Sequence, residues 1–128
     1  MKDFLAILAE EMDDSSEGFH TDIEKETIEN KKFRKILFTT EKIQLVVMSL
    51  KPNEEIGLET HPDTDQFIRV DEGTGEAIIG SKNLKLKDGS ALIIPAGNEH
   101  NITAGEDGLK IYTIYSPPHH EEDSFNNE

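Results

Sequence analysis

Between residues 33 and 115, short apolar runs alternate with polar residues, and glycine, proline and acidic residues separate the runs. Patterns of this kind predict β-strands bounded by turns. Residues 84–87 show it most clearly, because apolar and polar side chains alternate there as on a strand with one solvent-exposed face. The predicted strands cover residues 35–40, 43–50, 56–61, 66–70, 76–79, 84–87, 91–94, 100–103 and 109–115. Many short strands at near-regular spacing predict an all-β fold, either a sandwich or a jelly-roll β-barrel.

Glycines mark the predicted turns. Strands 66–70 and 76–79 are expected to pair as a hairpin across the glycines at positions 73 and 75. These two glycines lack the rest of a dinucleotide-binding fingerprint, so they predict turn geometry and not a phosphate site.

The two ends of the chain have a different character. Residues 3–13 carry apolar side chains at helical spacing and predict a short amphipathic helix, packed on its own domain or on a partner. The prolines, histidines and acidic residues that follow Ser116 predict an extended or disordered tail. A chain of 128 residues has room for one domain. We therefore expect a helical segment and linker at 1–18, a single barrel at 19–116 and an extended acidic tail at 117–128.

The charge balance narrows the function. The chain has 27 Asp and Glu against 13 Lys and Arg, a formal net charge of −14. Such a surface repels nucleic acid and anionic membranes, so we expect neither as a partner. The absence of cysteine excludes disulfides and thiolate chemistry and is compatible with a reducing cytoplasm. The apolar run at 4–9 is too short for a secretory signal or a membrane helix, so a cytoplasmic protein is expected.

One motif points to a site. Gly89, Pro95, Gly97 and His100 follow the spacing Gly, five residues, Pro, one residue, Gly, two residues, His. This resembles the second motif of the cupin superfamily, except that Ala104 stands where the motif has Asn. The resemblance covers residues 33–115 and implies a jelly-roll barrel of the small single-domain cupins that are similar to mannose-6-phosphate isomerase.

The first cupin motif is matched in spacing but not in residue type. Aligned on Gly73, it places His61 at the second histidine, Glu59 at the first histidine and Gln66 at the glutamate. The leading glycine of the motif is replaced by Asn53. The usual family set is three imidazoles and one carboxylate, so the resemblance implies a metal site with one imidazole fewer.

The residues themselves support convergence. Glu59 and His61 lie two apart and share a strand face. If this face is interior, Gln66 lines the next strand with Ile68 and Val70, and His100 lies on the opposite wall. Two imidazoles and a carboxylate suit a divalent transition metal, namely Fe, Mn, Ni or Zn. Gln66 would be a weak fourth ligand or a donor to bound water.

Other interpretations stay open at this point. His61 could cap a turn, His100 could be a core histidine, and Glu59 could be solvated. Gln66 could serve a substrate without a metal, or Asp65 could replace it in a shifted register. The pair His119-His120 predicts a solvated tail, and one of Tyr112 and Tyr115 should face inward. Few cations can reach the interior, because Arg69 has the parity of the outer face, although Lys110 stays open. This favours an uncharged or weakly charged ligand.

Three functions are compatible with the sequence. The first is a metal-dependent cupin enzyme acting on a small organic molecule by oxygenase-type or sugar isomerase-type chemistry, with catalytic residues unknown. The second is a non-catalytic binding or sensing cupin without a functional metal. The third is an interaction protein that uses residues 1–18 and the tail. A homodimer is expected, because pairing would protect unpaired strand edges.

Overall fold

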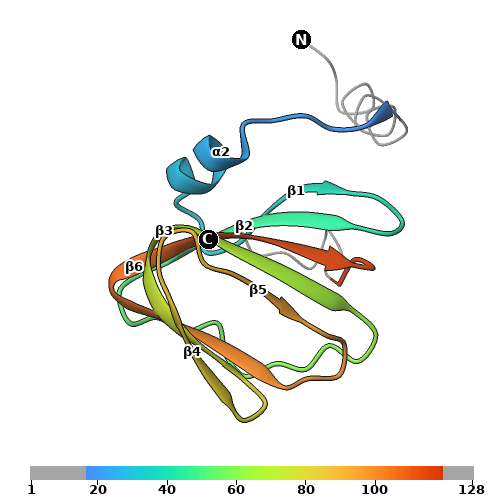
Figure 1. Cartoon of the computed structure of the whole chain (residues 1–128). Coiled ribbons are helices and arrows are strands. Elements are labelled where there is room, and N and C mark those ends of the chain that lie inside the picture. Colours follow the sequence, from blue (N-terminus) through green and yellow to red (C-terminus); the bar gives the residue numbers. More distant parts are fainter. Residues whose placement is uncertain (1–16, 120–128) are drawn as a thin grey trace.

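The computed structural model describes residues 17–119, and the predicted helix at 3–13 and most of the predicted tail lie outside this range. The chain in this range is mostly β with one short helix, α2 (Ile23–Glu29) (Figure 1). The strands are β1 (Lys35–Thr39), β2 (Gln44–Leu50), β3 (Asp65–Ile79), β4 (Lys82–Leu86), β5 (Ala91–Ile94) and β6 (His100–Ser116). The predicted all-β jelly-roll fold is confirmed.

The two long strands organise the sheet. The strand order is β1-β2-β6-β3-β4, all pairs are antiparallel, and β5 pairs with β3 off this path. The first half of β3 pairs with the end of β6 and with β5, and its second half pairs with the start of β6 and with β4. Register shifts after Val70 and after Gly73 interrupt this pairing. Because bulges bend a strand, β3 and β6 run from one layer of the jelly roll into the other (Figure 1).

The predicted hairpin between 66–70 and 76–79 is wrong. Gly73 and Gly75 lie inside one continuous strand and not in a turn. Gly73 has φ +100, and a Cβ there would overlap the carbonyl oxygen of Gly108 on β6. Glycine is therefore required by the close approach of two strands at a bulge, which a sequence pattern does not distinguish from a turn.

Two other elements also differ from the prediction. Residues 56–61 form no strand, and only isolated bridges from Glu55 to Thr103 and from Glu59 to His100 join this loop to β6. Helix α2 was not predicted, although Asp22 is an N-cap residue whose side chain accepts a hydrogen bond from the backbone N–H of Lys25.

The core lies between the layers. Inward parity is as expected on β3, where Gln66, Ile68 and Val70 are buried. Ile68 and Val70 belong to one core cluster with residues of β2 and β6. Burial of each such apolar side chain stabilises the fold by roughly 1.5–3 kcal/mol. The largest buried apolar side chains are Tyr115, Met48, Ile68, Ile94, Ile102, Leu109 and Ile111. Within residues 17–119, no helix is long and apolar enough to cross a membrane.

Candidate metal centre

The loop before β3 and the first residue of β6 bring the candidate ligands together. Glu59 and His100 exchange both backbone hydrogen bonds, each at 2.9 Å. The carbonyl of His61 accepts from the N–H of Gly97 at 2.8 Å. The loop is therefore hydrogen-bonded to β6 at His100 and to the β5–β6 turn at Gly97. These bonds bring the two predicted motifs together in space, although they are about 40 residues apart in the chain.

The side chains form a compact cluster. One ligand atom from each of Glu59, His61 and His100 lies within 4.8 Å of the others. Oε1 of Glu59 lies 3.4 Å from Nε2 of His61 and 4.0 Å from Nε2 of His100. The two histidines are 3–4% exposed, whereas the Glu59 side chain is 29% exposed. The predicted convergence of these three residues is therefore observed, with the carboxylate nearest to solvent.

The protonation states favour ligation. Nδ1 of His100 lies 2.9 Å from the carbonyl oxygen of Asn98, so this nitrogen donates and the Nε2 lone pair is directed towards Glu59. Burial, with smaller contributions from His119, His100 and Arg34, lowers the pKa of His61 from 6.5 to about 4. The His61 imidazole is therefore neutral near pH 7 and can present a lone pair, as a metal ligand must.

Several buried polar atoms of the candidate ligands have no hydrogen-bond partner among the described residues. They are both ring nitrogens of His61, Nε2 of His100 and Oε1 of Gln66. The amide nitrogen of Gln66 donates to the hydroxyl of Thr113 at 3.0 Å, which fixes the side chain. Buried polar atoms are seldom left unpaired. The unpaired nitrogens of the two histidines, on residues that cluster with Glu59, fit a bound cation.

Known proteins of similar sequence place the chain in a family. The cupin domain family matches residues 46–115, which is more than half of the chain. The chain belongs to the cupin domain family. An uncharacterised protein of Acanthamoeba polyphaga mimivirus matches 77% of this cupin at 46% identity. The uncharacterised protein YrkC of Bacillus subtilis matches 80% of this cupin at 41% identity. This cupin spans only 64% and 59% of the length of those two relatives.

A solved structure supports the same assignment. The crystal structure of a protein from Bacillus halodurans is 41% identical, with a TM-score of 0.79. The match covers 80% of this cupin and 83% of that chain. The cupin fold that the sequence motifs predicted is therefore confirmed.

The sequence did not place three residues, Tyr115, His119 and Arg34, at the cluster. Tyr115 is the inward tyrosine, and its ring meets the His61 ring edge-on at a centroid distance of 5.8 Å. His119, expected in a solvated tail, is exposed, yet its ring lies 3.9 Å from the His61 ring. Arg34 lies close enough for its charge to lower the pKa of both His61 and His119. Their residue types gave no signal, because only the fold brings both ends of the barrel sequence to this point.

The two cations considered from the sequence, Arg69 and Lys110, do not lie at the cluster. Arg69 is on the outer face of β3, with Nε 3.9 Å from Oδ1 of Asp71. Lys110 donates to the backbone oxygen of Asn30 at the end of α2, so it does not reach the interior. Of these three cations, Arg34 is the one whose charge acts on the histidines of the cluster.

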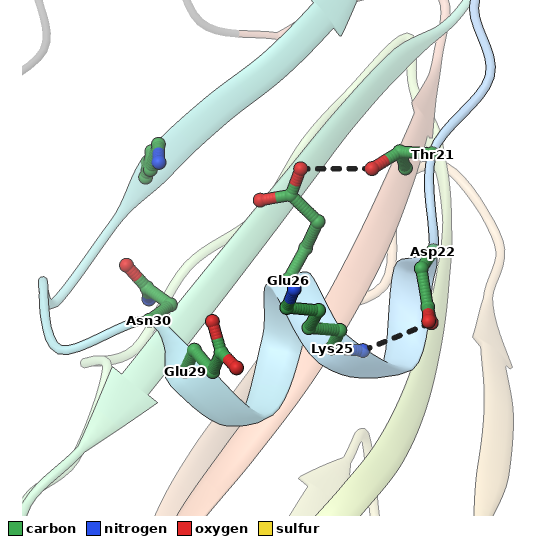
Figure 2. A pocket seen from close by; sticks show the side chains of 7 residues that line it. Thr21, Asp22, Lys25, Glu26, Glu29 and Asn30 are labelled. Carbon is green, nitrogen blue, oxygen red and sulfur yellow. Dashed lines mark hydrogen bonds between the residues drawn. The ribbon is translucent and has the colours of Figure 1, made fainter.

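A separate cleft of about 440 Å³ lies beside α2, between the helix and Lys35 on β1 (Figure 2). Its polar groups are used within the fold: Thr21 donates to Glu26 at 2.8 Å, and Asp22 caps the helix. None of its lining residues carries a buried polar atom without a partner in the described chain. The chemistry of this cleft is structural, in contrast to that of the histidine cluster.

Proposed function

We propose that this cupin binds one divalent transition metal at Glu59, His61 and His100, with Gln66 as a fourth donor or as a hydrogen-bonding group beside the ion. The observation that carries the proposal is the set of buried histidine nitrogens that lack partners and lie within 4.8 Å of a carboxylate oxygen. A ligand set of two imidazoles and one carboxylate suits Fe, Mn, Ni or Zn.

Each residue has a distinct part in holding the ion. His61 is kept neutral by burial, and the carbonyl of Asn98 selects the His100 tautomer with Nε2 unprotonated. Glu59 supplies the negative charge at the solvent-facing side of the cluster. Gln66 is held by Thr113, so its oxygen is pre-oriented. A bound metal would supply Lewis acidity and open coordination positions for a small organic substrate.

We propose an enzyme of oxygenase or sugar isomerase type, with a non-catalytic ligand-binding protein as the alternative. Burial raises the pKa of Tyr115, so its hydroxyl stays protonated at neutral pH beside the cluster. Arg34 adds a positive charge near the same point, which favours a substrate with an anionic or strongly polar group over a purely neutral one. This revises the preference drawn from the sequence, where no inward cation was identified.

Metal content tests the proposal. Untagged protein purified without chelators should contain close to one equivalent of Fe, Mn, Ni or Zn by mass spectrometry. A His61→Gln/His100→Gln variant should lose the metal, because both imidazoles are removed while the side chains stay polar. The matched control is His20→Ala, which removes an exposed histidine outside the cluster.

Two results would contradict the proposal. One is folded wild-type protein that takes up no metal even when Fe²⁺, Mn²⁺, Ni²⁺ or Zn²⁺ is supplied. The other is a folded double variant that retains the full metal content. If small molecules bound in the barrel without any metal, the non-catalytic alternative would be supported instead. Circular dichroism of each variant shows whether the fold is intact.

A further inference from the structure

A third imidazole reaches the cluster from outside the barrel strands. β6 ends at Ser116, and His119 follows three residues later. The His119 ring lies 3.9 Å from the His61 ring with an angle of 55° between the planes. It lies 5.7 Å from the ring of Tyr115, the inward residue at the end of β6. The chain just after β6 therefore brings His119 against the buried residues His61 and Tyr115.

We propose that His119 is a further protein ligand of the metal site, so that three imidazoles and the Glu59 carboxylate hold the ion. This inference rests on the proposed metal-binding function. It adds a ligand that neither of the two sequence motifs contains, because His119 lies beyond the barrel residues that the motifs span.

The His119 ring lies close to the proposed ligands. Nitrogen ligands bind such metals at about 2.0–2.1 Å, so two nitrogens on one ion lie roughly 3–3.5 Å apart. The rings of His61 and His100, which both belong to the cluster, have centroids 5.0 Å apart. The His119 ring is closer to His61 than this, although its nitrogens lie outside the 4.8 Å cluster. The proposal therefore requires the exposed His119 side chain to turn so that one of its nitrogens reaches the ion.

The electrostatic surroundings favour the same role. Partial burial lowers the pKa of His119, and Arg34 and His100 act in the same direction while Glu59 opposes them. On balance these surroundings lower the pKa of His119 and favour the neutral ring. Both His100 and Glu59 are close enough to influence His119, so this imidazole interacts electrostatically with each of the proposed ligands.

The added imidazole would change the site chemically. Two imidazoles and a carboxylate leave three positions open on a six-coordinate ion, whereas three imidazoles and a carboxylate leave two. The additional nitrogen also favours metals with a high affinity for imidazole, such as Ni, Cu and Zn, over Mn. His119 would thus influence both metal selectivity and the room left for a substrate.

The test counts imidazoles and measures affinity in untagged, full-length protein. All variants carry His120→Ala, so that the next histidine in the sequence cannot replace His119. In this background, protein with His119 intact is compared with His119→Ala, and His20→Ala serves as the matched control. Pulsed electron paramagnetic resonance of the Cu²⁺-loaded protein counts coordinated imidazoles, and chelator competition gives the Zn²⁺ affinity.

We expect three imidazoles with His119 intact and two in His119→Ala. Loss of an outer group that only orients a ligand typically weakens metal affinity about 10–100-fold, so loss of a ligand should weaken Zn²⁺ binding at least tenfold. His20→Ala should change neither readout. The same count and affinity in His119→Ala would overturn the inference while leaving the proposed function intact. Weaker affinity with an unchanged count would also overturn it, since His119 would then only shield the site. Absence of metal from every protein, wild type included, would instead refute the proposed function.

Discussion

Acidification should destabilise the metal-stripped protein through His61. The pKa of this histidine is about 4 in the folded state and 6.5 as an ordinary value, mainly because the ring is buried. The unfolded chain therefore binds a proton below about pH 6.5 that the folded chain rejects until about pH 4. A folded-state pKa that lies below the unfolded value lowers stability as the pH falls through this window. The stability contributed by neutral His61 is complete above the window.

The magnitude follows from the size of the shift. A difference of about 2.5 pKa units corresponds to about 3.4 kcal/mol when the shift is fully expressed. Between about pH 7.5 and about pH 4.5 most of it is expressed, so the free energy of unfolding should fall by about 2.5 kcal/mol from this group alone.

Urea denaturation at a series of pH values measures the effect, with a chelator present so that metal binding does not contribute. Other carboxylates and histidines also titrate in this range, so the relevant quantity is the difference between wild type and His61→Gln. The wild type should lose about 2.5 kcal/mol more than the variant, which has no imidazole at this position. If the two proteins lose stability in parallel from pH 7.5 to 4.5, the reasoning that burial keeps His61 neutral is refuted.

Three further substitutions test the fold around the site, each by urea or thermal denaturation. Gly73→Ala should cost roughly 2–5 kcal/mol, because its Cβ would overlap the carbonyl of Gly108 at a positive φ; a neutral effect would mean that the two strands can separate there. Thr113→Val should cost about 1–3 kcal/mol by leaving the buried Gln66 amide without its acceptor, and unchanged stability would show that this hydrogen bond contributes little. Asp22→Ala should cost about 1 kcal/mol through loss of the N-cap, with Asp22→Asn as the conservative control that should retain most of the stability.

The local sequence pattern determined which residues face inward. Alternation on β3 placed Gln66, Ile68 and Val70 in the core, because side chains on a strand alternate between the two faces. The spacing of Gly89, Pro95, Gly97 and His100 likewise identified the turn that precedes β6 and the histidine that follows it. Local chemistry was sufficient in both cases, since strand parity and turn geometry depend on near neighbours in the chain.

Tertiary structure decided the rest. Whether Gly73 ends a strand or sits in a bulge depends on the approach of Gly108, some 35 residues away, and no local pattern records that contact. The proximity of Arg34 and His119 to His61 has the same origin. Arg34 precedes β1 and His119 follows β6, and only the folding of these two strands into one sheet brings the residues together. The sequence by itself determined the fold class and the three residues that converge, Glu59, His61 and His100. The neighbours Arg34 and His119 were set by contacts distant in the chain.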